Sequence, residues 1–408
     1  MPQIKVLIVG AGLGGLCLAQ ALRKTHINVE VFERDASPWD RAQGYRLHLE
    51  ADALNALREV LPPDLHRLFE ATAMRTQPFT TILKTDLSVL KRIPSDDGQD
   101  PQYWPEFVSD EKVHCNMDRA TLREIVLLGL EDCCYFNKQF SSYESTVEGV
   151  VAKFADGTTV TGDLLVGADG IRSVVRPQRA PQLTTMDAGV QAIYGRVPYE
   201  VAQKLLPAEA MEDIFSIVID DRKLFLGTGA VKFPTKPDVA AKEILPSVRL
   251  NAREDYVVCI VGGRHELFPK SDTELRDAKP ADLQALAGEM IKDWPDNAQR
   301  FVASGDSDSF FIVGMHTSVP GELDAPTNVT LLGDAVHAMT PTLGRGANLA
   351  MRDAALLGRQ LKAVKDGEKP LGNALATYEE ELLRYGFDVV QESVTMGQQR
   401  MGQNPLPR

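Results

Sequence analysis

The sequence predicts an α/β protein in which a Rossmann-like domain is interleaved with a β-sheet domain and followed by C-terminal helices. Three observations support this prediction. The chain opens with a β-α-β pattern, alternating apolar and polar residues occupy its middle, and an apolar strand followed by two long helical patterns closes it. We expect one discontinuous domain from residues 1–75, 105–182 and 318–395, a second from residues 76–104 and 183–317, and a tail at 396–408.

The chain begins with a strand, a glycine turn and a helix. Ile4–Val9 is rich in β-branched residues, Leu13–Lys24 has helical spacing, and Val29–Phe32 returns to a strand pattern. The uncharged run Val6–Leu22 could pass for a membrane span, but it contains four glycines and leads directly into the second strand. No other apolar stretch approaches the ~18 residues of a membrane helix. We therefore expect no membrane span and a cytoplasmic protein.

The later elements follow from the same spacing rules. Asp156-Gly157 is a turn signal between two alternating runs and predicts a hairpin over 150–166. Alternation over 188–232 and 256–262 predicts a second, largely antiparallel sheet. The remaining predicted elements are helices at 51–71, 118–131, 281–293, 347–364 and 373–392, and a buried strand at 329–332.

Charge and cysteine content exclude several classes of protein. The 408 residues carry 44 basic and 57 acidic side chains, a net charge of −13, which argues against nucleic acid as the main partner. The five cysteines are scattered. They form no CxxC pair, a pattern that indicates free thiols in a reducing compartment. We predict no metal site.

A glycine loop follows the first strand. Gly10, Gly12 and Gly15 satisfy the pattern GxGxxG, and Glu33 ends the next strand, 23 residues after Gly10. In this context the glycines let the backbone approach a pyrophosphate at a helix N-terminus, and the acid accepts hydrogen bonds from an adenosine ribose. The loop therefore predicts an adenine dinucleotide site. Because the sequence contains no second strand-led GxGxxG, FAD is favoured as the tightly bound group.

Two later segments carry polar turns at strand ends. Asp169-Gly170 follows the predicted hairpin, within the segment Asp163–Arg176. Gly333-Asp334 follows the strand at 329–332, and a glycine-bracketed turn then starts a helix near Ala347. An Asp at a strand end can accept a hydrogen bond from a ribityl hydroxyl. The N–H groups of a helix N-terminus can face the flavin edge that becomes negative on reduction.

The three segments, in this order, resemble the group A (single-component) FAD-dependent aromatic hydroxylases, the para-hydroxybenzoate hydroxylase-like flavoprotein monooxygenases, over about residues 3–390. The resemblance implies a glutathione-reductase-type FAD-binding domain interleaved with a substrate-binding sheet domain. It also implies that the Asp-Gly segment serves both FAD and transiently bound NADPH or NADH. The sequence departs from the family pattern at Ala338, Leu343 and Arg345. The cofactor-binding residues that the resemblance and the motifs indicate are Gly10, Gly12, Leu13, Gly14, Gly15, Glu33, Arg34, Gly44, Arg46, Arg119, Asp169, Gly170, Gly333, Asp334, Pro341, Gly344, Arg345, Gly346, Ala347 and Asn348.

The resemblance further implies hydroxylation of an aromatic or polycyclic small molecule in secondary metabolism or catabolism. In that mechanism NAD(P)H reduces FAD, O₂ adds at flavin C4a, and the resulting hydroperoxide transfers oxygen to the substrate. Since the chemistry is centred on the flavin, we predict no catalytic side chain and a structural role for His337. The expected partners are the aromatic substrate, O₂ and NAD(P)H, with the protein a monomer or a homodimer.

Several alternatives stay open. The same flavin oxygen adduct supports Baeyer–Villiger oxidation or epoxidation, whereas a reductase of the same fold would insert no oxygen. A flavin-binding protein without turnover is a third class. Tyr194, Phe215 and Phe225 lie on the predicted sheet and suit either a substrate pocket or the core.

Overall fold

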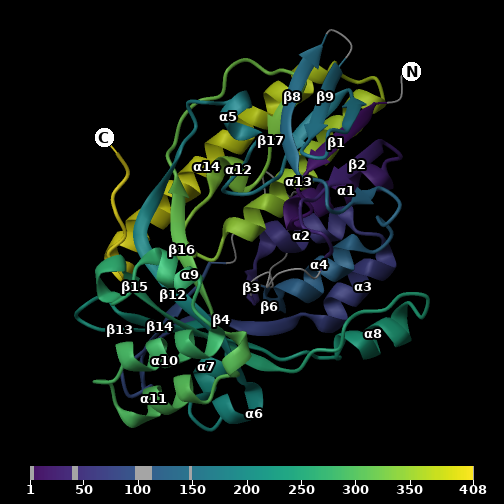
Figure 1. Ribbon diagram of the computed structural model, residues 1–408. Coiled ribbons are helices and arrows are strands. Elements are labelled where there is room, and N and C mark those ends of the chain that lie inside the picture. Colours follow the sequence, from purple (N-terminus) through teal and green to yellow (C-terminus); the bar gives the residue numbers. More distant parts are fainter. Residues whose placement is uncertain (1–3, 39–44, 97–112, 147–148, 408) are drawn as a thin grey trace.

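Two sheets of different kinds lie at opposite ends of the molecule (Figure 1). The structure, a computed structural model, describes residues 4–38, 45–96, 113–146 and 149–407, so the predicted cofactor residue Gly44 lies outside the described residues. A parallel sheet occupies the upper right of Figure 1 and a larger sheet the lower left, with helices around both. The predicted division into two interleaved domains stays a prediction.

The parallel sheet has the strand order β17-β11-β1-β2-β7. Strands β1, β11 and β17 are short apolar runs that are almost wholly buried, as expected for a parallel sheet covered by helices. Val9 pairs with both Phe32 and Gly167, and Gly167 pairs with Leu331. The segments that follow these four strands therefore start from one edge of the sheet. The strands are β1 (Lys5–Val9), β2 (Asn28–Phe32), β7 (Cys134–Tyr135), β11 (Leu164–Gly167) and β17 (Val329–Leu331).

A small antiparallel sheet packs beside the parallel one. It consists of β8 (Phe140–Thr146), β9 (Gly149–Phe154) and β10 (Thr159–Gly162), in the order β10-β9-β8. Residues 156 and 157 form the turn between β9 and β10, where the Asp156 side chain accepts a hydrogen bond from the N–H of Thr158 at 3.0 Å. The hairpin predicted over 150–166 is therefore confirmed.

The large sheet has the strand order β16-β12-β15-β14-β13-β4-β6-β3, with β5 paired to β4. Its central strands are antiparallel neighbours, as the alternation predicted, whereas β13 and β4 run parallel. Strands β3 and β6 extend the sheet toward the glycine loop. The strands are β3 (Arg46–Leu49), β4 (Met74–Leu83), β5 (Val89–Pro94), β6 (His114–Asp118), β12 (Thr185–Pro198), β13 (Asp213–Ile219), β14 (Phe225–Val231), β15 (Tyr256–Arg264) and β16 (Phe311–Ser318).

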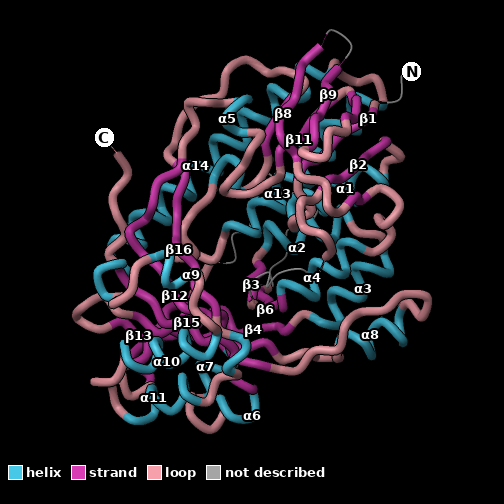
Figure 2. The backbone as a smooth tube through the Cα atoms, viewed as in Figure 1, coloured by secondary structure: helices cyan, strands magenta, loops and turns pink. Residues whose placement is uncertain are grey.

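Helices surround the parallel sheet and cover one face of the large one (Figure 2). Helix α1 packs against α13, α2 and α4, and α13 packs in turn against α14. The first group comprises α1 (Leu13–Lys24), α2 (Ala51–Val60), α3 (Pro63–Thr72), α4 (Arg119–Leu127), α5 (Arg176–Arg179), α12 (Asp334–His337), α13 (Gly346–Lys365) and α14 (Leu371–Met401). The second comprises α6 (Tyr199–Ala202), α7 (Ala208–Glu212), α9 (Asp272–Arg276), α10 (Pro280–Met290) and α11 (Asp296–Ala303), with 3₁₀ turns at His265–Leu267 and Ser307–Ser309. Helix α8 (Pro237–Ile244) packs against α3 instead.

Two of the predicted segments differ in detail from the structure. The helix predicted over 51–71 is two helices, because Pro62 and Pro63 follow Leu61 and a proline cannot continue a helix from within. The tail predicted at 396–408 is wrong in its first part, since α14 continues to Met401. Beyond it, Gln403 is buried and accepts a hydrogen bond from Thr340. Within the described residues, no helix is both long and apolar enough to cross a membrane.

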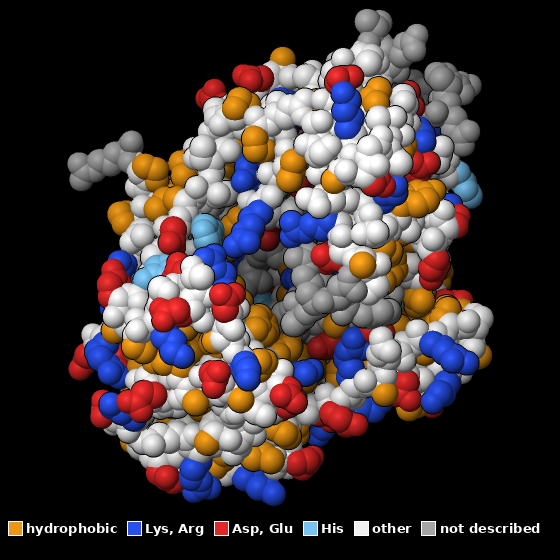
Figure 3. Space-filling model, in the orientation of Figure 1, with side chains coloured by type: hydrophobic (Ala, Val, Ile, Leu, Met, Phe, Trp, Pro, Cys, Tyr) orange, Lys and Arg blue, Asp and Glu red, His pale blue; other side chains and the backbone are white. Residues whose placement is uncertain are grey.

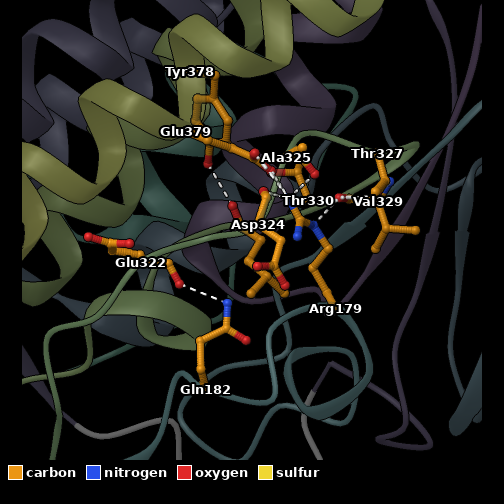
Figure 4. Close-up of polar contacts among 11 residues, drawn as sticks. Arg179, Gln182, Glu322, Asp324, Ala325, Thr327, Val329, Thr330, Tyr378 and Glu379 are labelled. Carbon is orange, nitrogen blue, oxygen red and sulfur yellow. Dashed lines mark hydrogen bonds and ion pairs between the residues drawn. The ribbon is translucent and has the colours of Figure 1, made fainter.

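A buried ion pair ties the end of the chain to the parallel sheet (Figure 4). Arg179 of α5 pairs with Glu379 of α14 at 3.1 Å and donates to the carbonyl of Val329 at 2.8 Å. The hydroxyl of Thr330 donates to the same Glu379 carboxylate at 2.8 Å. Because both charges are buried and hydrogen-bonded, breaking the pair would leave an uncompensated charge, at a cost of about 3–5 kcal/mol. The contact fixes β17, the strand that leads into Gly333.

Candidate functional site

The three predicted motifs meet at the carboxyl edge of the parallel sheet. Backbone hydrogen bonds continue the ladder past the strand ends: the N–H of Ala168 donates to Val9, and the N–H of Leu332 donates to Gly167, each at 2.9 Å. In open α/β sheets this edge is where ligands bind. Segments that are more than 300 residues apart in the sequence thus form one site.

The glycines of the first loop have two different surroundings. A Cβ at Gly15 would lie 2.1 Å from the carbonyl oxygen of Gly10, so the close approach of α1 to β1 requires glycine there. A Cβ at Gly12 would meet no atom within 4 Å, and Gly12 lines a cavity. Gly15 therefore serves the packing of helix on strand, and Gly12 borders space that a ligand can occupy.

Glu33 holds the glycine loop in place. Its carboxylate accepts hydrogen bonds from the backbone N–H of Ala11 at 2.9 Å and of Asp35 at 3.1 Å, and the side chain is buried. From the other side, Arg123 of α4 donates to the carbonyl of Ala11 at 2.9 Å. The sequence analysis did not single out Arg123. Arg34, predicted as a cofactor residue, is exposed.

The second motif is bound to the third by an arginine. The Asp169 carboxylate accepts from the N–H of Val174 at 2.6 Å and so closes its own turn. Arg176, at the end of the same segment, donates to the carbonyl of Ala335 at 3.1 Å. This contact joins the Asp-Gly turn to the Gly-Asp segment. Gly170 lines the cavity, whereas Asp169 does not.

Asp334 presents its carboxylate to the cavity and accepts no hydrogen bond from any described residue. Although the side chain is accessible, the protein around it removes enough water to raise the pKa of Asp334, against the opposing effect of His337 and Arg119. Behind it, His337 and Asp353 form a fully buried pair at 2.8 Å. His337 thus makes a buried hydrogen bond, as expected, and its purely structural role stays a prediction.

Asn348 joins the glycine-bracketed turn to β3. Its amide nitrogen donates to the carbonyls of His48 at 2.9 Å and of Gly344 at 3.0 Å, and its oxygen accepts from the N–H of Glu50 at 2.9 Å. The side chain is fully buried, so it positions the turn rather than lining the cavity. Gly344 has φ +70°, a conformation that side chains rarely adopt.

Arg345 is an ion-paired residue at the cavity wall. Its guanidinium lies 2.7 Å from Glu50 and 3.5 Å from Asp52. Burial raises the pKa of Glu50 to about 7, although Arg345 acts in the opposite direction. Glu50 also lines the cavity, and sequence reasoning missed it. Its only signal was its position four residues after Arg46, a predicted cofactor residue.

One cavity of about 740 Å³ opens between the motifs and the large sheet. Figure 3 shows the surface hollowed between the two parts of the molecule, with Lys and Arg side chains on the upper rim. The predicted cofactor residues that line the cavity are Gly12, Leu13, Gly14, Arg46, Arg119, Gly170, Gly333, Asp334, Pro341, Gly344, Arg345, Gly346 and Ala347. Among the described residues, those that do not line it are Gly10, Gly15, Glu33, Arg34, Asp169 and Asn348.

The opposite wall of the cavity is apolar and partly aromatic. Tyr194, Phe215 and Phe225, whose role the sequence left open, all line it. They come from β12, β13 and β14 of the large sheet, and Ile260 and Met315 from β15 and β16 join them. We call this face the sheet wall, and the face formed by the three motifs the motif wall. A flat apolar molecule could bind against the sheet wall while the motif wall holds a charged one.

The motif wall fits FAD. Open space borders Gly12 at the N-terminus of α1, where unpaired N–H groups and the helix dipole favour a pyrophosphate. The accessible Asp334 carboxylate offers an acceptor for a ribityl hydroxyl. The N-terminus of α13 begins at Gly346 on the same wall and offers N–H donors to a flavin edge. No group of His, Cys, Asp or Glu suited to a metal ion occurs in the described part of the chain.

Comparison with known proteins gives the same assignment. The family described as FAD binding domain matches residues 128–393, and an NAD(P)-binding Rossmann-like domain matches residues 8–61. The chain belongs to the FAD-binding family of flavoprotein monooxygenases. FAD is therefore the cofactor of this flavoprotein, as the motifs predicted.

Similar proteins from fungi and bacteria cover nearly all of this chain. The dual O-methyltransferase/FAD-dependent monooxygenase elcB of Phaeosphaeria nodorum is 33% identical over 98% of the chain, which spans 46% of that relative. The FAD-dependent monooxygenase dbaB of Emericella nidulans is 29% identical, with 89% of this chain and 88% of the relative covered. The FAD-dependent urate hydroxylase of Klebsiella pneumoniae is 26% identical, with 92% and 85% covered.

A solved structure shares the whole fold of this flavoprotein. It is the crystal structure of a putative FAD-containing monooxygenase from Photorhabdus luminescens, with a TM-score of 0.80, 27% identity and 98% of each chain covered. The predicted fold class, an α/β protein with a Rossmann-like FAD-binding part, a large sheet and C-terminal helices, is thereby confirmed.

Proposed function

We propose that this flavoprotein is a monooxygenase that uses NADPH or NADH and O₂ to hydroxylate an aromatic or polycyclic small molecule. The observation that supports it is the pair of unlike walls around one cavity. The motif wall carries the features of an FAD site, and the sheet wall is apolar and aromatic. A cofactor and a flat substrate can then lie face to face, which is the arrangement that oxygen transfer from a flavin needs.

The residues proposed to hold FAD act at four places. Gly12 and the start of α1 receive the pyrophosphate, Glu33 supports the loop at the ribose end, and Asp334 accepts from the ribityl chain. The backbone N–H groups at Gly346 and Ala347, which line the cavity, would donate to the isoalloxazine edge. When bound, FAD supplies redox chemistry, taking two electrons from NAD(P)H and making O₂ reactive toward the substrate.

The chain contributes positioning, electrostatics and exclusion of water. The N-terminal end of α13 carries partial positive charge, which stabilises a flavin that has gained electrons. The apolar side chains Phe225, Ile260 and Met315 keep the substrate face dry, so that reduced oxygen is not lost as hydrogen peroxide. Tyr194 stays a neutral phenol on this wall, because burial raises its pKa to about 12.

The names of the relatives support oxygen insertion as the reaction class. They include two FAD-dependent monooxygenases and a urate hydroxylase, together with zeaxanthin epoxidase of Nicotiana plumbaginifolia, 25% identical over 88% of this chain. Hydroxylation and epoxidation therefore both occur among similar proteins. A role in secondary metabolism or catabolism, a cytoplasmic location and a monomeric or homodimeric state belong to the same proposal.

Isotope labelling tests the reaction. The FAD-loaded protein is incubated with NADPH or NADH, a panel of aromatic compounds and ¹⁸O₂, and the products are analysed by mass spectrometry. One labelled oxygen atom in a phenolic product supports the proposal. A labelled ester or epoxide would instead identify Baeyer–Villiger oxidation or epoxidation. Oxidation of NAD(P)H with unlabelled organic product would identify a reductase, and no substrate-stimulated oxidation would indicate a binding protein.

A further inference from the structure

A long segment between β14 and β15 reaches from the large sheet to the helices of the parallel sheet. We call residues 232–255 the arm; it carries α8, which packs against α3 in the lower right of Figure 1. The N–H of Thr235 donates to the carbonyl of Ala71 in α3 at 3.0 Å. Ala240 and Leu250 of the arm are buried in the same hydrophobic core as the parallel sheet. The arm thus continues the large sheet along the chain but packs with the other part of the molecule.

The two ends of the arm are held together where it leaves the large sheet. The ammonium group of Lys236 lies 2.9 Å from the carboxylate of Asp255, and the same carboxylate accepts from the N–H of Phe233 at 3.0 Å. Because β14 and β15 are paired neighbours, the base of the arm is tied to strands that carry the sheet wall.

A buried carboxylate, that of Glu124, fixes the arm to α4. It accepts from the N–H of Asn251 at 2.8 Å and from the side-chain amide of the same residue at 3.0 Å, and it pairs with the guanidinium of Arg253. Arg253 also lies 3.2 Å from Asp118. Asp118 caps α4, since its carboxylate accepts from the N–H of Thr121 at 2.8 Å. The arm therefore holds α4 at its N-cap and in its second turn.

Helix α4 carries two groups that belong to the motif wall. Arg119, its first residue, lines the cavity, and Arg123 donates to the carbonyl of Ala11 in the glycine loop at 2.9 Å. The helix has only nine residues. A helix this short is not stable by itself, so tertiary contacts decide where it lies. The contact between Glu124 and the arm is one of them, and it is formed by the residue next to Arg123.

We propose that Glu124 is a positioning residue for FAD. By binding the arm, it holds α4 where Arg119 and Arg123 serve the cofactor site, so that docking of the arm and binding of FAD favour each other. The proposal rests on the proposed function in one respect, that FAD occupies the motif wall beside the glycine loop. It gives Asn251 and Arg253, which do not line the cavity, an effect on a cofactor that they do not touch.

Charge and position predict opposite effects for Glu124. FAD is an anion, so removing a nearby acid strengthens its binding if charge alone acts, whereas removing Arg253 weakens it. If the contact acts by positioning α4, both Glu124→Gln and Arg253→Gln weaken FAD binding, because each breaks the same contact. The signs of the two effects therefore distinguish positioning from charge.

The dissociation constant of FAD tests the proposal. The FAD-loaded protein is diluted stepwise, and the rise in flavin fluorescence gives the constant. We expect about 3- to 30-fold weaker binding in Glu124→Gln and in Arg253→Gln, the range of coupling between sites that do not touch. The double variant should be no weaker than the weaker single one, since both changes remove one contact. Asn251→Ala keeps both charges and should weaken binding by about two- to fivefold, which provides a test if the charge variants do not fold.

Hydrogen exchange of the FAD-loaded proteins gives a second readout. In Arg253→Gln, amide exchange should become faster in α4 at 119–127 and in the glycine loop at 10–15, although neither segment contains the substitution. The N–H of Asn251 donates to Glu124, so faster exchange at this amide in Glu124→Gln reports directly that the arm has come away from α4.

Asp213→Asn is the matched control. Asp213 of β13 is also a buried carboxylate that pairs with an arginine, Arg92, at 2.6 Å, and neither residue lines the cavity. This variant should lower the urea midpoint but leave the dissociation constant of FAD within about twofold, since it lies away from α4 and the arm. An unchanged constant in Glu124→Gln or Arg253→Gln, tighter binding in Glu124→Gln, or equal weakening in Asp213→Asn would overturn the proposal.

The two proposals fail separately. The binding and exchange measurements need bound FAD but no substrate, whereas the ¹⁸O₂ experiment reports on oxygen insertion. Labelled product together with unchanged FAD binding in Glu124→Gln would keep the monooxygenase function and reject the positioning role. Weaker FAD binding in the arm variants without labelled product would do the reverse.

Discussion

Gly12 and Gly15 belong to one loop, but replacing them should have different effects. We expect a change at Gly15 to lower the stability of the fold and a change at Gly12 to lower the affinity for FAD. A Cβ at Gly15 would lie 2.1 Å from the carbonyl oxygen of Gly10, against about 3.4 Å for ordinary contact, so the helix must move by more than an ångström. Gly15→Ala should therefore cost about 1–3 kcal/mol in free energy of unfolding, the usual range for overpacking. This cost arises in the protein without FAD.

Gly12→Val should spare the fold and weaken the cofactor. Gly12 has extended backbone (φ −77°, ψ 178°) and open space around its Cα, so any residue can adopt its conformation. Losing glycine at a helix N-cap costs at most about 1 kcal/mol. The added side chain occupies the space proposed for the pyrophosphate. We expect FAD affinity to fall at least ~10-fold, about 1.4 kcal/mol.

Two measurements separate the variants. Urea unfolding of the FAD-free proteins gives the stability of each fold, and quenching of flavin fluorescence gives the dissociation constant of FAD. Gly15→Ala should have the lower unfolding midpoint, and Gly12→Val the weaker FAD binding with a nearly unchanged midpoint. If Gly12→Val binds FAD as tightly as the unaltered protein, the cavity beside Gly12 does not receive the cofactor.

Three further predictions concern buried charges. Glu33→Ala should lower FAD affinity and stability by about 1–3 kcal/mol, because the glycine loop loses a buried acceptor; equal FAD content and melting temperature would contradict this. Burial acts to lower the pKa of His337, but the Asp353 carboxylate outweighs it and the pKa is raised. The folded protein therefore binds the proton more tightly than the unfolded chain, so this stability is complete below about pH 6.5 and is lost as the pH rises through the raised pKa. His337→Asn should flatten the pH dependence of urea midpoints between about pH 6 and pH 9. Arg345→Gln removes the cation beside Glu50, whose pKa of about 7 should rise further, and a pH titration of the bound flavin spectrum should show its inflection at higher pH.

Local sequence patterns were sufficient to predict the three motifs of the site and their positions at strand ends. A β-branched run followed by glycines specifies a strand and a tight turn whatever the rest of the chain does, so Gly12, Gly170 and Gly333 could be placed at strand ends. The family resemblance then assigned these three strand ends to one FAD site. Helix bounds were less certain where long-range packing decides them. α14 continues to Met401 because Gln403 and Asn404 dock onto residues far back in the chain.

The sequence by itself determined the class of the protein, its cofactor and the segments that hold it, because these depend on short-range spacing. Only the tertiary structure decided what each polar side chain does. Asn348 joins the turn to β3, Arg345 pairs with Glu50, and Arg46 donates to the carbonyl of Ile214. These roles depend on contacts between residues about 170 to 300 positions apart. A side chain's charge is visible in the sequence, but its partner is set by which distant strand or helix the fold places beside it.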